Sequence, residues 1–480
     1  MNQTIPSKPT TNYRWGICAL LFAATSINYL DRQVLSLTWK DFIQPEFHWN
    51  NNDYGNITAL FSIFYAVSML FAGKFVDFMD TKKGFLWAIG VWSVGACLHA
   101  YCGIAASGIL TGNWFVGFEE SKEIIKTVDN VALVGSTSVM LFIFARFVLA
   151  VGEAGNFPAA IKTTAEYFPK KDRALSTSIF NSGAAVGALS APLLIPRIAE
   201  KWGWEMSFII IGILGFVWMG FWVFIYKKPE QNTKMSVSEL AYIQQDHGLE
   251  EELNVNKKVS FAQCFKYKQT WAFAFGKFMT DGVWWFYMFW TPAYLSSVYG
   301  IKSSDGVGQA AIFVLYTITL LSIIGGWLPS YFINKKGMDP YAGRMKAMLI
   351  FAFFPLLALI AQPLGSYSFW LPVIIIGIAG AGHQAWSANI MSTVGDMFPK
   401  KAIATITGIG GMAGGVGSLI INKGSGVLFD FAGTTQMEFM GFKGEEAGYF
   451  IIFSICAVVY LIGWVVMKSL VPVYKPVTDL

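Results

Sequence analysis

The chain has 480 residues, of which 54% are hydrophobic and only 14% are charged, and its formal net charge is +5. A soluble domain carries about a quarter charged residues, so this composition excludes an ordinary soluble protein and predicts extensive lipid-facing surface. Lys and Arg stand at the ends of apolar segments and form no basic patch, which excludes nucleic-acid binding as the reason for the positive charge.

Apolar runs long enough to cross a membrane follow one another along the whole chain. A spanning helix needs about 20 mostly apolar residues. The separation of the fifth and sixth runs depends on a short turn that we predict at Lys201–Trp204. We therefore predict an all-α integral membrane protein with twelve transmembrane helices, at 15–38, 55–78, 84–106, 136–164, 173–198, 205–227, 269–298, 307–333, 345–363, 369–394, 402–431 and 446–470.

The first of these runs is a spanning helix by our interpretation and not a cleaved signal peptide. Residues Met1 to Arg14 are polar, and the apolar run that follows is longer than a signal-peptide core. The run also ends in Tyr29-Leu-Asp-Arg32, where a cleavage site would need small residues.

Basic residues gather in alternate loops, for example at Lys82-Lys83, Lys170-Lys171 and Lys400-Lys401. Because cytoplasmic loops are enriched in Lys and Arg, we expect both termini to be cytoplasmic and the protein to lie in the plasma membrane of a bacterium, its inner membrane. The longest of these loops, 228–268, divides the chain into an N-terminal half, 1–227, and a C-terminal half, 269–480. Six helices on each side are typical of two parallel halves built from inverted repeats.

Two loops on the opposite side, 107–135 and 432–445, are longer than chain closure requires. The first is expected to contain a small amphipathic helix around Glu119–Val134. The sequence assigns a function to neither loop.

Several of the predicted helices carry ionisable residues within the hydrocarbon region, where charges are costly and each one is a functional hypothesis. Arg146 and Glu153 are seven residues apart, so they share one helix face but lie about 10 Å apart. Each therefore needs a partner from another helix or from a water-filled cavity. A structural salt bridge between helices is the alternative, both for these two residues and for the adjacent pair Asp31 and Arg32.

The charges of the second half have simpler alternatives. Lys277 and Asp281 are four residues apart and can neutralise each other on one helix face. His383 is equally consistent with a hydrogen-bonded core histidine. Lys423 lies nearer a helix end and is consistent with a side chain that reaches along the helix toward the interface.

No motif of an enzyme or of a nucleotide-driven pump is present. The chain has no GxxxxGK[ST] and no HExxH pattern, and its five cysteines lack CxxC or metal-ligand spacing. The glycine-rich run Gly410–Gly415 lies inside an apolar helix, where it favours close helix packing. We predict no catalytic residue, no cofactor and no metal. A channel would require repeated rings of pore-lining residues, and none is apparent.

The segment Gly73–Asp77 (GKFVD), followed by Asp80, Lys82, Lys83 and Gly84, resembles the loop signature of the major facilitator superfamily. Phe78 replaces the arginine that usually follows the acid. The resemblance implies a fold of two six-helix halves. In such a loop the acid and the bases after it latch the halves together, so we assign gating to Asp77 and Lys82.

A more specific resemblance covers nearly the whole chain. Segments of the first half resemble the anion:cation symporter family, whose members import organic anions, mainly sugar acids; these are Asn28–Arg32 (NYLDR), Ala145–Pro158 (ARFVLAVGEAGNFP) and Phe180–Gly183 (FNSG). Segments of the second half are most similar to hexuronate transporters of that family, namely Asp281–Tyr287 (DGVWWFY), Gly380–Trp386 (GAGHQAW) and Gly408–Met412 (GIGGM).

The roles that this family implies fall on named positions: proton coupling on Asp31 and Glu153, carboxylate binding on Arg32 and Arg146, and aromatic hydroxyl contacts on Tyr29 and Tyr65. To the same substrate site we assign polar and aromatic side chains that can bind hydroxyl groups or stack on a sugar ring: Asn181, Lys277, Trp284, His383, Gln384, Trp386 and Asn389. Aldonate carriers of the family have glutamines where this chain has Ala184 and Lys277, which favours a ring-form uronate.

The sequence therefore predicts a proton-coupled symporter that imports a hexuronate, such as glucuronate or galacturonate, by alternating access. Its predicted partners are the small organic anion, the proton and the lipid bilayer, and it is expected to be a monomer. The alternative is a carrier of another organic anion, such as an aldonate or dicarboxylate, coupled to a different cation.

Overall fold

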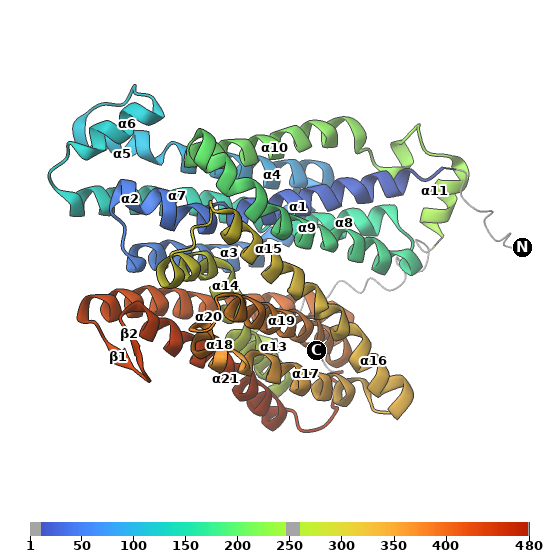
Figure 1. The fold of residues 1–480 in the computed structure, drawn as a ribbon. Helices are drawn as coiled ribbons and strands as arrows, with labels where there is room; N and C mark the ends of the chain where they lie inside the picture. The colour runs from blue at the N-terminus through green and yellow to red at the C-terminus, as the bar shows by residue number, and fades with distance from the viewer. Residues whose placement is uncertain (1–10, 246–259, 479) are drawn as a thin grey trace, which may run out of the picture.

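The computed structural model describes residues 11–245, 260–478 and 480, and nearly all of them lie in helices (Figure 1). The helices of the first part of the chain are α1 (Tyr13–Thr38), α2 (Gln44–Phe47), α3 (Asn51–Met79), α4 (Thr81–Ala100), α5 (Cys102–Thr111), α6 (Phe118–Lys126), α7 (Val131–Glu153), α8 (Asn156–Tyr167), α9 (Lys170–Trp202) and α10 (Trp204–Ile225). A π-helical turn, Trp39–Ile43, joins α1 to α2.

The second part of the chain continues the helical pattern with one small hairpin. Its elements are α11 (Val237–Gln244), α13 (Phe261–Cys264), α14 (Lys268–Tyr299), α15 (Gly306–Thr319), α16 (Ile324–Lys336), α17 (Pro340–Leu356), α18 (Ala358–Gly365), α19 (Trp370–Met397), α20 (Lys400–Thr435), the antiparallel strands β1 (Glu438–Phe439) and β2 (Phe442–Lys443), and α21 (Glu445–Leu470).

The long helices in the described part of the chain form twelve segments of spanning length. Nine segments are long and apolar enough to cross a membrane, and the pair α4 and α5, bent by 54°, makes a tenth. The remaining two, α1 and α14, are equally long but carry charged residues in their middle parts. The predicted turn at Lys201–Trp204 is confirmed: α9 ends at Trp202, and Gly203 has the positive φ of 88° that favours glycine.

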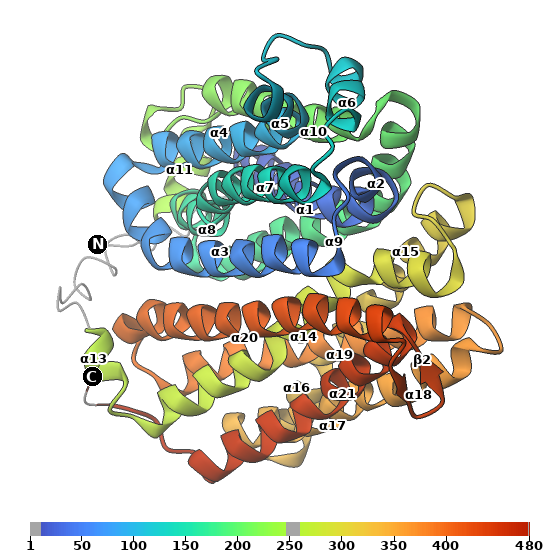
Figure 2. The same cartoon turned by 90° about the vertical axis from the view of Figure 1, so that its left-hand side faces the viewer.

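The helices form two groups that face each other across the middle of the molecule. Figure 1 shows α1 to α10 in one group and α14 to α21 in the other. In Figure 2, α3 and α20 lie side by side at the boundary between them. Glycines in α20 allow this close approach, because a Cβ atom at Gly415 or Gly426 would clash with α3. A Cβ atom at Gly415 would lie 2.3 Å from that of Ala66, and one at Gly426 would lie 2.5 Å from the Asn51 carbonyl oxygen.

The long loop before α7 contains a shorter helix than the sequence predicts. We expected helix around Glu119–Val134, but α6 ends at Lys126 and α7 begins after Asn130, whose side chain caps it. The break between the two helices costs little stability, because the Asn130 side chain accepts a hydrogen bond from a backbone N–H that would otherwise be unpaired at the start of α7.

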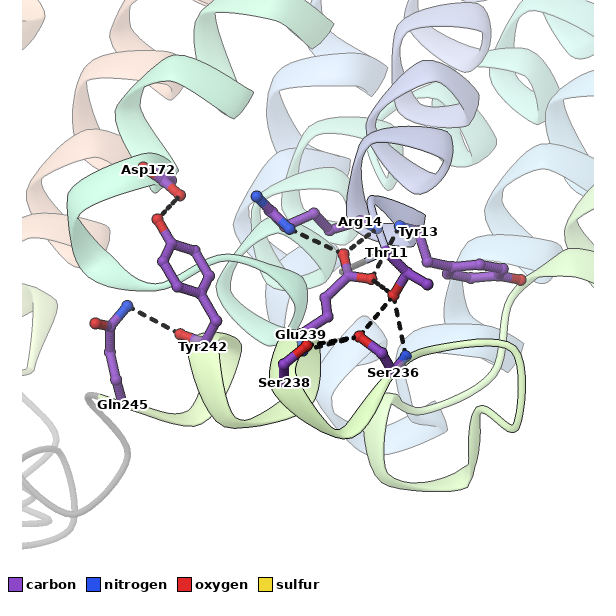
Figure 3. Close-up of polar contacts among 9 residues, drawn as sticks. All are labelled: Thr11, Tyr13, Arg14, Asp172, Ser236, Ser238, Glu239, Tyr242 and Gln245. Carbon is purple, nitrogen blue, oxygen red and sulfur yellow. Dashed lines mark hydrogen bonds and ion pairs between the residues drawn. The ribbon is translucent and has the colours of Figure 1, made fainter. Parts of the chain in front are cut away.

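Residues 228–245 of the 228–268 loop contain α11, which packs on the first helical turns of the chain (Figure 3). The buried carboxylate of Glu239 in α11 accepts hydrogen bonds from the backbone N–H groups of Tyr13 and Arg14, both at 3.1 Å, and from the Arg14 guanidinium at 3.0 Å. Tyr242 donates to Asp172 of α9 at 2.8 Å. We call this end of the molecule the linker end, and the end that carries β1 and β2 the hairpin end.

Candidate functional site

A central cavity of about 710 Å³ lies between the two helix groups. Both groups contribute to its wall, and five of the predicted substrate residues line it: Tyr29, Asn181, Lys277, Trp284 and Gln384. The wall contains both polar and apolar side chains, as a sugar with hydroxyls and an apolar face requires.

Arg32 of α1 is paired with Glu153 of α7 directly behind this wall. Its Nε and Nη2 atoms donate to one carboxylate oxygen of Glu153 at 3.0 and 2.7 Å, and both side chains are buried. The guanidinium also lies over the rings of Tyr29, Tyr65 and Trp285, 4.6–5.2 Å from their centroids. Arg32 is therefore held by one carboxylate and three aromatic faces, and Tyr65 contacts it without lining the cavity.

Asp31 and Arg146 are buried beside this pair but form no salt bridge in the described structure. Both carboxylate oxygens of Asp31 and the Nη1 atom of Arg146 lack a hydrogen-bond partner among the described residues. Arg146 packs its guanidinium 5.1 Å from the centroid of the Phe61 ring. Asp31 is within electrostatic range of Arg146, Arg32 and Glu153. Arg146 thus keeps donor capacity that an anion can use.

Lys277 and Asp281 pair with each other at 2.7 Å on α14, the arrangement that their spacing allows. Lys277 nevertheless lines the cavity, so its ammonium group is shared between Asp281 and the space open to a ligand. The pair is partly exposed, with 11% of the Lys277 side chain accessible. A small anion can approach this cation without first breaking the pair.

His383 lies behind Trp284 and supports it. The two rings stack with centroids 5.5 Å apart and planes at 5°, and His383 Nδ1 lies 2.7 Å from the Tyr460 hydroxyl. His383 is therefore a hydrogen-bonded core histidine that fixes a wall residue. Tyr460 was not predicted as a site residue, since it carries no charge and belongs to no motif.

Trp386 and Asn389 lie outside the residues that line the cavity. Trp386 packs edge-on against Tyr460 at 5.5 Å. The amide of Asn389 donates to the carbonyl oxygens of Gly325 and Ala385, both at 2.8 Å. Asn389 thus ties α19 to α16 where a 3-10 turn, Leu320–Ile323, interrupts the helical span.

Other wall residues were not predicted as site residues, and all of them are uncharged. They are Phe157, Ala184, Ala185, Ala188, Tyr316, Thr319, Leu320, Ser322, Ile323, Gly326, Ser387, Ala388 and Met391. Hydroxyl residues in an apolar helix, such as Thr319 and Ser387, are the sequence feature that could have indicated wall positions. The feature is weak, because many such hydroxyls only bond a carbonyl of their own helix.

The predicted gate at Asp77 and Lys82 stays a prediction. The side chain of Asp77 lies outside the described residues. Lys82 donates to the carbonyl oxygen of Val223 at 2.8 Å, which joins α4 to α10 within one helix group.

The hairpin end carries contacts between the groups that the sequence did not indicate. Asp41 accepts hydrogen bonds from the Ser296 hydroxyl at 2.8 Å and from the backbone N–H and hydroxyl of Ser303, both at 2.7 Å. Asp430 of α20 accepts from the backbone N–H groups of Asn51 and Asn52 at 2.9 and 2.6 Å. These N–H groups open α3, and a helix N-terminus favours a carboxylate.

Lys423 adds a third contact at this end, since its ammonium lies 2.5 Å from the side-chain oxygens of Asn52 and Asn56. The groups are therefore joined at the hairpin end. In contrast, the cavity wall continues from Gln384 to Met391 along α19, toward the linker end. We conclude that side-chain contacts join the two groups at the hairpin end, and that the cavity wall extends from the middle of the molecule toward the linker end.

Removing both carboxylates, by Asp41→Ala with Asp430→Ala, is expected to open the hairpin end. Hydrogen bonds to a charged group contribute about 1.5–3 kcal/mol each, so the open population should rise about tenfold or more. Spin labels on cysteines at the exposed positions Val131 and Val307 report the distance across this end.

Glu438→Ala is the matched control, because Glu438 pairs only with Lys443 within the hairpin. An unchanged distance distribution in the double variant would show that the two carboxylates do not hold the end closed.

The residues described by the structure contain no cluster of three or more His, Cys, Asp or Glu side chains that could hold a metal ion.

The comparisons with known proteins agree with this architecture. The sequence profile described as Major Facilitator Superfamily matches residues 21–422. The hexuronate transporter of Escherichia coli (strain K12) is 26% identical over 428 residues, which cover 88% of this chain and 89% of that protein. The probable galactarate/D-glucarate transporter GarP of the same organism is 24% identical over 424 residues, covering 86% and 87%.

The fold is also found in a solved structure. A bacterial homologue of the human lysosomal transporter Spinster, in an inward-facing and occupied conformation, superposes with a TM-score of 0.66 at 16% identity. The alignment covers 96% of this chain and 97% of that one.

Proposed function

Because this chain belongs to the Major Facilitator Superfamily, and is a transporter and not an enzyme, we propose that it imports a hexuronate by proton symport. The observation that carries the proposal is the cavity wall, which offers the Lys277 cation, amides and a stacking ring to one ligand. Two buried arginines, Arg32 and Arg146, lie behind it. A relative at 26% identity is named a hexuronate transporter.

Each part of a uronate has a counterpart in this arrangement. Lys277 and the arginines supply positive charge for the carboxylate, and Asn181 and Gln384 supply amides for the hydroxyls. Trp284 offers its indole face to the apolar face of a sugar ring.

The Arg32–Glu153 pair provides a physical route to coupling. With Glu153 ionised, its carboxylate occupies the Nε and Nη2 donors of Arg32. A proton on Glu153 cancels the charge that holds Arg32, and the guanidinium is then free to bind the substrate carboxylate. Proton and anion thus bind together, and loss of the proton restores the pair and weakens the hold on the anion.

We also propose the orientation of the molecule. Lys and Arg residues concentrate at the linker end, so this end and both termini face the cytoplasm. The cavity wall of this structure then extends toward the cytoplasm. The halves 1–227 and 269–480 move as units about the 228–268 segment, in a protein that acts as a monomer in the bacterial inner membrane.

Competition among sugar acids is the test of the substrate class. With uptake of radiolabelled glucuronate into proteoliposomes as the signal, we expect unlabelled glucuronate and galacturonate to compete at the lowest concentrations. Gluconate, galactarate and the neutral sugar glucose should compete poorly. If galactarate competed best, the carrier would be one for dicarboxylates, the function by which GarP is named.

The same panel applied to Lys277→Gln separates a substrate contact from a structural role. If Lys277 touches the anion, the ranking of uronates and aldonates should change. Lys468→Gln is the control, because Lys468 bonds the Pro472 carbonyl away from the cavity. An unchanged ranking with reduced thermal stability would assign the Lys277–Asp281 pair to structure alone.

A further inference from the structure

Asn28 and Asn156 are buried amides to which no role has been given. Both are fully buried, and neither the oxygen nor the nitrogen of either amide has a hydrogen-bond partner among the described residues. Leaving a buried polar group unpaired costs about 1–3 kcal/mol. Two such side chains at one place are therefore evidence of a further ligand.

The two asparagines lie at the same level of the molecule, next to the carboxylates. Asn28 precedes Asp31 by three residues on α1 and so shares its face. Asn156 follows Glu153 by three residues, and the residues between them keep helical dihedrals.

The directions of the two helices place both amides on the same side of the Arg32–Glu153 pair. α1 starts at the linker end, where Arg14 meets α11, and α8 ends there, where the Tyr167 hydroxyl donates to the Lys227 carbonyl. The helices are thus antiparallel, and α1 packs against α8. One turn from the pair toward the linker end leads to Asn28 on one helix and to Asn156 on the other.

The unpaired atoms of the neighbouring carboxylates belong to the same region. Both carboxylate oxygens of Asp31 and one of Glu153 have no hydrogen-bond partner among the residues that the structure describes. A buried water typically makes about three hydrogen bonds to polar groups that otherwise lack partners. Donors and acceptors for such waters are present on both helices, and the two free amide nitrogens are donors that a water molecule can satisfy.

We propose that Asn28 and Asn156 hold ordered water molecules that connect the carboxylates of Asp31 and Glu153 to the linker end. The inference rests on the proposed proton symport: the waters give the coupled proton its exit while the hairpin end is closed. The asparagines are positioning residues, because they hold water and do not themselves carry the proton.

The titratable and charged groups that face this region among the described residues come from four helices. They are Asp31, Arg32 and Tyr29 on α1, Tyr65 on α3, Cys97 on α4, and Arg146 and Glu153 on α7. Among these, Asp31 and Glu153 are the two acids to which the proposed symport assigns the coupled proton. A changed pH profile in an asparagine variant therefore reports on the access of protons to these two acids.

The test replaces both amides by an apolar side chain of similar size, Asn28→Leu with Asn156→Leu. Counterflow of substrate, which needs no net proton movement, should persist. Accumulation driven by a pH gradient should fall by roughly ten- to a hundredfold. The serine double variant, Asn28→Ser with Asn156→Ser, keeps a donor and an acceptor at each position and should recover most of the accumulation.

Thr25→Val and Thr163→Val are matched controls, since each hydroxyl bonds a carbonyl of its own helix. They should leave the pH profile unchanged. Full accumulation by the leucine variant, or a loss of counterflow equal to the loss of accumulation, would overturn the proposal. So would a raised melting temperature with normal coupling, because a dry site gains stability when its unpaired amides are removed.

An experimental structure that resolves ordered water provides the independent readout. It should show at least one water within hydrogen-bond distance of each amide, and a dry site would refute the inference. If wild-type uptake did not depend on the pH gradient, the proposed proton symport would be wrong. The experimental structure would still test the bound waters, because it does not depend on the transport assay.

Discussion

Arg146→Gln is expected to lower sugar-acid uptake by roughly a hundredfold or more while folded protein remains in the membrane. Losing one partner of a buried, hydrogen-bonded charge pair costs about 2–5 kcal/mol. Arg146 is a buried arginine whose Nη1 atom has no hydrogen-bond partner among the described residues, so we expect it to form such a pair with the substrate carboxylate. It is engaged in no salt bridge there, so its replacement leaves no carboxylate newly unpaired. Initial uptake rates in proteoliposomes and gel-filtration profiles measure the two parts of the prediction.

Arg32→Gln provides the comparison, because Arg32 differs from Arg146 in its pairing. Uptake should again fall to background, but the melting temperature should fall as well, since Glu153 loses the cation that it contacts at 2.7 Å. Arg146→Lys keeps the charge without the planar fork and should retain part of the activity. Near-normal uptake by both glutamine variants would show that neither arginine anchors the carboxylate.

The twelve spans were predictable because their signal is local. Apolar runs of sufficient length dictate helices in a membrane, and Gly203 marks the turn between α9 and α10. The interruptions within spans were not predictable. The 3-10 turn at Leu320–Ile323 has an apolar sequence that fits a continuous helix, and Asn389 from another span supports it from behind.

The site shows the same division between local and distant information. The sequence identified the costly intramembrane charges, and the spacing of Lys277 and Asp281 allowed the pairing that the structure contains. Spacing could not choose Glu153 as the partner of Arg32, because that choice depends on which helices meet. Periodicity gives the face of a helix but not its neighbour.

The contacts at the hairpin end were hidden for a related reason. Asp430 and Asn52 lie near helix ends, where such residues ordinarily serve as caps or face solvent. Their meeting across the two helix groups depends on the packing of α3 against α20, which only the three-dimensional structure reveals.

Glu153→Gln is expected to separate binding from accumulation. Glutamine resembles the protonated acid in shape and charge, so it should release Arg32 permanently for the substrate carboxylate. The variant should therefore bind the sugar acid and exchange it in counterflow at near wild-type rates. It should fail to concentrate substrate when only a pH gradient is applied, because position 153 no longer takes up or releases a proton.

Asp31→Asn tests whether the second acid shares this task. Asp31 contacts no described hydrogen-bond donor and is within electrostatic range of both arginines. Its neutralisation should therefore alter coupling without breaking an existing ion pair, and we expect accumulation to be lost with folding unchanged. Counterflow and pH-driven uptake are measured on the same proteoliposomes. A lower ratio of pH-driven uptake to counterflow in the variant than in the wild type would show that Asp31 takes part in coupling.

If both variants still accumulated substrate, the coupling proton would have to bind elsewhere, with Asp281 and His383 as the next groups to replace. If accumulation followed a sodium gradient instead, the two acids would bind a cation other than the proton. The pairing of Arg32 with Glu153 would then have to be broken by that cation.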